Sequence, residues 1–279
     1  MASQYLNADY PNYHLFDKTR CEILHQYLNG LEEQIDNLSK GISENKSISI
    51  GIVNGITGIG IIDLCYPEVM SVNSNKTVFL FATHKLTDFV LEQYYRLKLA
   101  TKNIGVLYLL IEDGELQQIP VDVKYYSFSV DTLNELNYEP IEESIIPGSN
   151  HFPVLQFYKE HPEFLYYWNI EYDVYFNGKW ESFFDPFEMI ISDFISSHIE
   201  WYTQRPKWDW WKSVQFKTLS IPQNRYLKSF NPIYRISNRA LKALDGVLSL
   251  RNSGHHEVVI PTVLDYLGYT INDFGGNSE

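Results

Sequence analysis

Along residues 76–130, continuous runs of apolar residues are separated by a segment in which apolar residues recur at helical spacing. Thr77 to Thr83 is a short, β-prone apolar run, as is typical of a buried strand. Leu86 to Leu99 carries apolar residues at helical spacing, and Ile104 to Ile111 is a second run of the buried-strand type. Tyr125 to Val130 is a candidate third strand. Strand, helix and strand at this spacing predict a right-handed βαβ unit with a parallel sheet.

The remaining pattern predicts further helices and strands up to Gly268. Pro153 stands near the start of one predicted helix, where proline is tolerated, and Ser237 is a suitable N-cap for another. In chain order, we expect a helix at 152–161, a buried strand at 164–170, a short helix at 182–187, a strand or loop at 229–237, a helix at 238–250 and a last helix that opens at 253–257 and ends at Gly268.

Residues 1–75 differ from this pattern, and we therefore predict two domains, a helical and glycine-rich appendage at 1–75 and a main domain at 76–279. Residues 17–38 have helical spacing, and a glycine-rich run follows at 48–61. Its glycines superficially suggest a phosphate-binding loop, but no Lys-Ser/Thr pair follows them. The Gly-x-x-Gly-Ile-Gly pattern within 54–71 resembles the closing helix of lanthionine-synthetase cyclase-type domains. The zinc ligands of those cyclases have no counterpart, so no cyclase activity is implied.

Composition excludes several classes of function. The chain has 279 residues, a net charge of −13 and a pI near 5.0, which argues against a nucleic-acid-binding surface. Its two cysteines are too few for a disulfide framework. The sequence shows neither a signal-peptide pattern nor an apolar run long enough to span a bilayer, so we expect a cytoplasmic protein, with peripheral membrane contact left open.

The strongest chemical signal is a pair of carboxylates, Glu171 and Asp173, directly after the apolar run 164–170. Residues i and i+2 of a strand point to the same side, so both acids are expected to face one way. Two neighbouring carboxylates repel each other, and a divalent cation relieves that repulsion. The alternative is that both acids face solvent or pair with Lys or Arg.

Three motifs carry a resemblance to a known fold. They are Trp-x-x-Glu-Tyr-Asp-Val at 168–174, Gly-x-Trp-x-x-Phe-Phe at 178–184 and His-x-Glu-Val-x-x-Pro-Thr at 255–262. With the order of the elements, they make residues 76–279 similar to uncharacterised bacterial proteins with a GT-A-like glycosyltransferase fold. The resemblance implies an α/β fold, with a Rossmann-like nucleotide-binding half and a mixed, mostly parallel sheet. GT-A enzymes often carry Asp-x-Asp, and here the first acid is Glu171.

The same resemblance implies an activity. It is the transfer of a hexosyl or N-acetylhexosaminyl group from a nucleotide-diphosphate donor to a carbohydrate or cell-surface acceptor, assisted by Mn²⁺ or Mg²⁺. Asp173 is implied as the metal ligand and His255 as a late ligand, while Glu171 is implied to hold the ribose hydroxyls. Arg235 is a candidate for offsetting diphosphate charge.

Other candidates follow from position. Because ligands collect at the carboxyl ends of parallel strands, Thr83, His84 and Lys85 are candidate nucleotide contacts, against an ordinary strand-to-helix turn. Glu257, in the first turn of a predicted helix, is the candidate base that activates the acceptor, although the helix dipole alone explains a carboxylate there. Asp193 is either an acceptor contact or a cap.

Tryptophans are concentrated before the predicted strand at 229–237. Trp208, Trp210 and Trp211 are candidates for a wall that stacks on a sugar ring, with core packing as the alternative. Two further hypotheses compete with the transferase. One is a binding or scaffold protein with a decayed GT-A-like fold, and the other is a metal-dependent hydrolase that uses the same acids and histidines.

Overall fold

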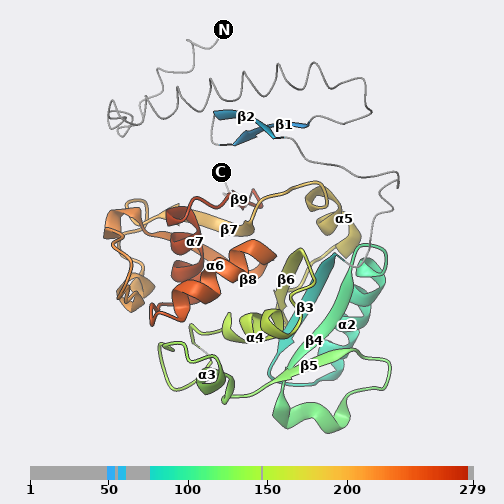
Figure 1. Ribbon diagram of the computed structural model, residues 1–279. Helices are drawn as coiled ribbons and strands as arrows, with labels where there is room; N and C mark the ends of the chain where they lie inside the picture. The colour runs from blue at the N-terminus through green and yellow to red at the C-terminus, as the bar shows by residue number, and fades with distance from the viewer. Residues whose placement is uncertain (1–48, 54–55, 61–75, 146, 276–279) are drawn as a thin grey trace, which may run out of the picture. The chain divides into compact units, whose positions relative to one another are not determined.

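The structure is a computed structural model that describes residues 49–53, 56–60, 76–145 and 147–275 (Figure 1). The chain divides into two compact units, residues 1–71 and 72–279. In the first unit, β1 (Ser49–Val53) pairs antiparallel with β2 (Ile56–Gly60).

The β1–β2 hairpin corrects the helical interpretation of the glycine-rich segment. Residues 56–60 form a strand because isoleucine and threonine favour extended backbone, while glycine weakens a helix. The Asn-Gly pair at 54–55 is a hairpin signal in sequence. The rest of that segment, and the helix predicted at 17–38, lie outside the described residues.

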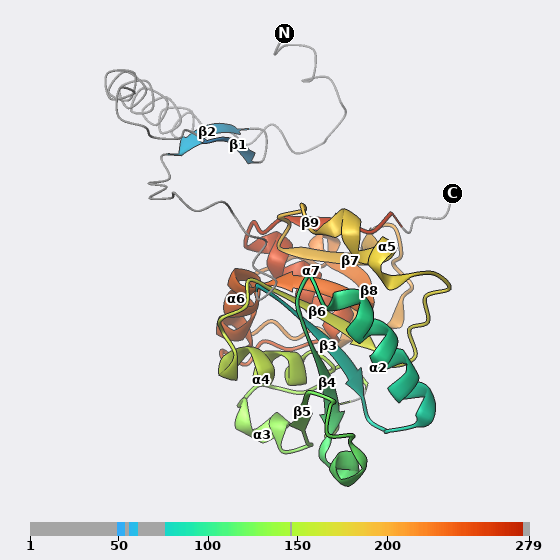
Figure 2. The same ribbon diagram turned by 90° about the vertical axis from the view of Figure 1, so that its right-hand side faces the viewer.

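The second unit is built around a mixed sheet, which confirms the predicted α/β class. Among the described residues it has seven strands in the order β5-β4-β3-β6-β8-β7-β9 (Figures 1 and 2). All run parallel except β8, which is antiparallel to both of its neighbours. The strands are β3 (Thr77–Thr83), β4 (Val106–Glu112), β5 (Tyr125–Phe128), β6 (Tyr166–Glu171), β7 (Phe194–Trp201), β8 (Leu227–Ser237) and β9 (Ile271–Asp273).

Helices cover both faces of the sheet (Figure 2). One core packs α2 and α5 against strand residues such as Phe79 and Phe81, and the other packs α4, α6 and α7 against residues such as Val78 and Leu80. Because both faces of the sheet are buried, the sequences of its strands are nearly continuous apolar runs. The helices are α2 (Asp88–Thr101), α3 (Thr132–Glu135), α4 (Phe152–Glu160), α5 (Trp180–Phe184), α6 (Asn238–Leu248) and α7 (His256–Tyr266), with short 3₁₀ turns η2 (Asp113–Gln118), η3 (Asp185–Phe187), η4 (Asp209–Ser213) and η5 (Gln223–Arg225).

Local signals in the sequence set several helix starts. The Thr87 hydroxyl accepts a hydrogen bond from the Val90 amide and caps α2. Ser237 caps α6 in the same way through the Ala240 amide, which confirms its predicted role. Pro153 occupies the first turn of α4, as its missing amide hydrogen allows.

The strand directions bring distant residues to one edge of the sheet. The carboxyl ends of β3, β4, β5 and β6 meet there. Ile233 of β8 pairs with Ile170 of β6, so the start of β8, before Ile233, extends beyond the end of β6 at the same edge. Asp193 precedes β7, which runs parallel to β6, and therefore lies at the opposite edge. No helix among the described residues is long and apolar enough to cross a membrane.

Candidate functional site

A cavity of about 400 Å³ lies where the carboxyl ends of β3 to β6 meet. Such an edge is where open α/β sheets bind ligands. Of the predicted nucleotide contacts, Thr83, His84 and Glu171 line this cavity and Lys85 does not. Its other lining residues are Ala82, Leu110, Glu112, Phe128, Val130, Ser144, Ile145, Asn150, Pro153, Asn169 and Tyr172.

Two lining residues of this cavity carry polar atoms that no described residue satisfies. The Oδ1 atoms of Asn150 and Asn169 are buried without a hydrogen-bond partner in the described part of the chain. Asn169, only 2% exposed, stands inside the apolar strand β6. A buried amide oxygen without a partner is costly, so these atoms are suited to hydrogen bonds with a ligand. Sequence reasoning missed both residues, although a polar residue within the apolar run 164–170 was a usable signal.

Glu171 is the most perturbed acid of this edge. Burial raises the pKa of its carboxyl to about 7, and the neighbouring carboxylates of Asp173 and Glu257 act in the same direction. The side-chain amide of Asn150 donates a hydrogen bond of 3.0 Å to Glu171 and partly opposes this rise in pKa. The acids of the following turn and of α7 therefore both act on the Glu171 carboxyl at this edge.

The two acids do not lie on one strand face as expected. β6 ends at Glu171, and the chain then turns, with the Val174 amide donating to the Glu171 carbonyl at 3.0 Å. Asp173 is exposed in that turn. The i, i+2 rule fails here because it applies only while the backbone stays extended.

Glu257 lies in the first turn of α7, as predicted, and is half-buried. Its Oε1 accepts a hydrogen bond of 3.1 Å from the Asn231 amide at the start of β8. Burial raises the pKa of Glu257, although the Asn231 amide and the Lys228 ammonium oppose that rise. The raised pKa makes the Glu257 carboxylate a stronger base.

An aromatic wall stands next to Glu257. The Trp210 ring stacks on the His255 ring at 4.3 Å, and Trp208 packs edge-on against Trp211 at 5.0 Å. Trp211 is buried and donates its indole hydrogen to the Arg205 carbonyl, so it is a core residue. Trp208 and Trp210 are only partly buried and offer more surface to a ligand. The Nζ of Lys228, a residue that sequence reasoning missed, lies 5.4 Å from the Trp208 ring centre.

Arg235 lies away from the cavity. It is 3% exposed, and its guanidinium donates to the backbone carbonyls of Phe187, Ile190 and Ser192. It also stacks over the Tyr166 ring at 4.3 Å. These contacts hold the loop before β7 in place, and no phosphate contact is needed to explain a buried cation here.

Asp193 also has a full set of partners within the protein. Its carboxylate accepts two hydrogen bonds of 2.6 Å from Arg239 and further ones from Ser237 and Thr270. Burial alone acts to raise the pKa of Asp193, but these hydrogen bonds outweigh it and lower the pKa. Asp193 lies at the opposite edge of the sheet from Glu171. Its hydrogen bonds there connect the start of β7 to α6 and to the segment before β9.

Three histidines are buried beside the acids. His151, His255 and His256 stack in series, with ring centres 6.3 Å apart for His151 and His256 and 4.7 Å apart for His255 and His256. Burial lowers the pKa of His151 to about 3 and that of His255 to about 4, and it lowers the pKa of His256 as well. The imidazoles are therefore neutral at pH 7, and the His255 contact with Glu257 at 3.8 Å is not an ion pair.

The histidine cluster predicts a loss of stability in acid. Unfolded histidine takes up a proton below about pH 6.5, but His151 stays neutral in the folded state down to about pH 3. The free energy of unfolding therefore falls as the pH drops from 6.5 towards 4. We expect His151→Leu to reduce that slope by about 1 kcal/mol per pH unit, measured by urea denaturation between pH 6 and 4.5. His198→Asn, at an exposed histidine, is the control, and an unchanged slope in His151→Leu would contradict this account.

The donor atoms at this edge suit a hard cation that arrives with its own phosphate ligands. Among the described residues, no group of three or more His, Cys, Asp or Glu side chains stands ready to hold a metal ion. Mg²⁺ sites of phosphate-transferring enzymes often use one or two carboxylates plus the substrate phosphates. Glu171 and Asp173 fit that requirement, while His255 is a weaker candidate ligand because its Nδ1 already accepts a hydrogen bond from the Glu257 amide.

Comparison with known proteins gave no relative: no family model matches the chain, and no curated protein matches it.

Proposed function

We propose that this protein is a GT-A-like glycosyltransferase that moves a sugar from a nucleotide-diphosphate donor to a carbohydrate or cell-surface acceptor. The observation that carries the proposal is the convergence of Glu171, Asp173 and Glu257 beside a cavity at the carboxyl ends of parallel strands. A buried carboxylate in a cleft, with its pKa raised by burial and by neighbouring acids, is typical of functional sites. The mostly parallel mixed sheet is the kind that the GT-A resemblance implies.

The donor is proposed to occupy the 400 Å³ cavity. The free amide oxygens of Asn150 and Asn169 accept hydrogen bonds from its N–H or O–H groups, and His84 forms part of the wall. Glu171 and Asp173 hold a divalent cation together with the donor phosphates. When bound, Mn²⁺ or Mg²⁺ neutralises the charge that develops on the leaving diphosphate.

The acceptor is proposed to approach from the side of α7. Its hydroxyl lies against Glu257, whose raised pKa suits removal of the proton as the new bond forms. The Asn231 amide fixes the orientation of that carboxylate through one oxygen and leaves the other for the acceptor. Trp208 and Trp210 form the wall against which a sugar ring packs.

A panel of nucleotide sugars with Mn²⁺ tests this function. We expect one donor to bind and to be hydrolysed slowly without an acceptor, measured by release of nucleoside diphosphate. Glu257→Gln should keep donor binding within about twofold and lower the hydrolysis rate about 100-fold, because it removes the base but not the cavity. Absence of binding and hydrolysis over the whole panel would refute the transferase proposal.

A binding protein with the same fold is the second candidate. The position of Asp173 in an exposed turn, beyond the end of β6, favours it, because the two acids are then not fixed on one strand face. A nucleoside diphosphate that raises the melting temperature equally with Mn²⁺ and with a chelator, and is never turned over, would support this candidate. A thermal shift that requires Mn²⁺ favours the enzyme.

A further inference from the structure

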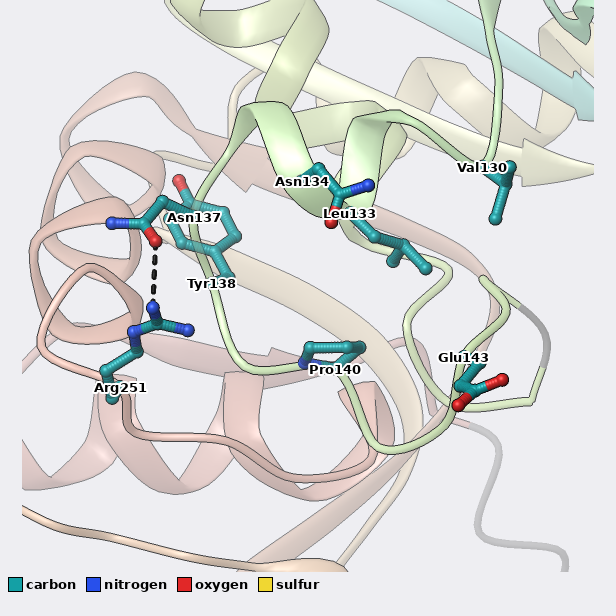
Figure 3. Close-up of a pocket in the computed structure, with 8 residues that line it drawn as sticks. All are labelled: Val130, Leu133, Asn134, Asn137, Tyr138, Pro140, Glu143 and Arg251. Atoms are coloured by element: carbon teal, nitrogen blue, oxygen red, sulfur yellow. Dashed lines mark hydrogen bonds between the residues drawn. The ribbon is translucent and has the colours of Figure 1, made fainter.

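A second cavity, of about 420 Å³, lies beside the proposed donor cavity and has a different chemical character. Val130 lines both cavities. Figure 3 shows Arg251 and Glu143 at opposite ends of the second cavity, with apolar side chains and Pro140 between them. The lining residues are Val130, Leu133, Asn134, Asn137, Tyr138, Pro140, Glu143 and Arg251.

The wall of this second cavity includes the segments that follow the ends of α3 and α6. Asn137 and Arg251 have φ angles of 55° and 62°, the left-handed backbone that commonly ends a helix, and they follow the ends of α3 and α6. The two face each other, and Arg251 donates a hydrogen bond of 2.9 Å to the Asn137 side-chain oxygen (Figure 3). A hydrogen bond between Tyr138 and Asp245 joins the same segment to α6.

Several polar groups of this cavity remain available to a ligand. In the part of the chain that the structure describes, neither the Asn134 side-chain amide nor the Glu143 carboxylate has a hydrogen bond or ion pair. Arg251 uses its guanidinium for Asn137 and, at 3.5 Å, for Glu139, which leaves some of its five N–H donors free. An amide, a carboxylate and a guanidinium therefore line one small volume, with Arg251 and Glu143 at its opposite ends.

We propose that this second cavity binds a neutral mono- or disaccharide, independently of the transferase reaction. Planar amide, carboxylate and guanidinium groups donate to and accept from neighbouring hydroxyls in pairs. Leu133, Val130 and Pro140 supply apolar surface for the C–H face of a sugar ring. The volume is at the lower end of the range for pockets that hold small organic ligands.

The charges favour a neutral ligand over an anion. Arg251 contributes one positive charge to the lining and Glu143 one negative charge, so the lining is neutral as a whole. Arg251 is further offset by Glu139, and the protein has a net charge of −13. A phosphate or an acidic sugar would meet repulsion from Glu143, which has no ion pair among the described residues, whereas a neutral sugar meets none.

Saturation-transfer NMR on the full chain, with maltose, cellobiose and lactose as probes and no nucleotide or metal, tests this site. We expect at least one disaccharide to bind with a Kd of about 1 mM, typical of a few hydrogen bonds in a half-open site. Glu143→Ala should weaken that binding at least fivefold, and so should Asn134→Ala. Both residues are exposed, so the variants are expected to fold. Glu142→Ala, at an exposed neighbour outside the cavity, is the matched control.

The outcomes separate this proposal from the transferase function. Loss of saccharide binding in Glu143→Ala, with donor hydrolysis unchanged, supports a separate site. Three results would overturn it: no binding of any disaccharide, tighter binding of glucuronate or glutamate than of the neutral probes, or binding that survives Glu143→Ala and is lost in Trp208→Ala. The last result would assign the sugar to the aromatic wall beside Glu257.

Discussion

Glu171→Gln is expected to make the protein more stable at pH 8 while it removes most of its activity. Burial raises the pKa of Glu171 to about 7, so the folded state holds this proton over a pH range in which the unfolded chain has already lost it. Stability therefore falls as the pH rises from about 4.5 through 7. Since one pKa unit corresponds to about 1.4 kcal/mol, the ionised carboxylate costs at most about 3 kcal/mol at pH 8.

Glutamine keeps the shape of Glu171 and can still accept the hydrogen bond from Asn150, so the variant avoids that cost. We expect the free energy of unfolding of Glu171→Gln to exceed that of the wild type by about 2–3 kcal/mol at pH 8 and to equal it near pH 4.5. Donor hydrolysis should fall about 100-fold or more, because a ligand of the proposed cation is lost. Such an exchange of stability for activity is common at active sites.

Urea denaturation across this pH range and release of nucleoside diphosphate are the two measurements. Glu181→Gln, at an exposed acid of α5, is the control and should change neither. Mn²⁺ with a nucleoside diphosphate should stabilise the wild type more than Glu171→Gln, since only the wild type offers the carboxylate. Equal stabilisation of the two proteins would argue that Glu171 does not contact the cation.

Asp193→Ala is expected to have the opposite effect, a large loss of stability without a loss of activity per folded molecule. The carboxylate is 1% exposed and accepts hydrogen bonds from Arg239, Ser237 and Thr270. Its removal leaves the buried hydroxyl of Ser237 and the half-buried donors of Thr270 without their acceptor. We expect the free energy of unfolding to fall by about 2–4 kcal/mol.

The same variant tests the role that the sequence indicated for Asp193. If Asp193 contacts the acceptor, Asp193→Ala should raise the KM for the acceptor. If Asp193 only connects elements at the far edge of the sheet, the KM should not change. We expect kcat and KM, corrected for the folded fraction, to stay within about twofold of the wild type. Asp185→Ala, at an exposed acid, serves as the control for stability. A rise in KM with unchanged stability would restore the acceptor-binding hypothesis.

Several elements of the fold could be predicted from residues that are close together in the sequence. The run at 77–83 became β3 with the predicted bounds, and Ser237 became the N-cap of α6. These features depend on residues close together in sequence, because strand burial is visible as a continuous apolar run and a cap needs only a neighbouring amide. The prediction for the glycine-rich segment was wrong because it followed a resemblance to a known helix. The isoleucines of that segment favour a strand.

The sequence by itself determined the α/β class, the strand-helix-strand order of β3, α2 and β4 and the acids that deserved attention, whereas β7 and β9 were not predicted. Only the tertiary structure decided which of those acids meet. Glu171 and Glu257 are far apart in the chain, and the packing of β6, β8 and α7 brings them to one edge, while Asp193 and Arg235 take their partners elsewhere. Burial and partners, which set charge and pKa, arise from such long-range contacts, and the spacing of residues along a chain does not encode them.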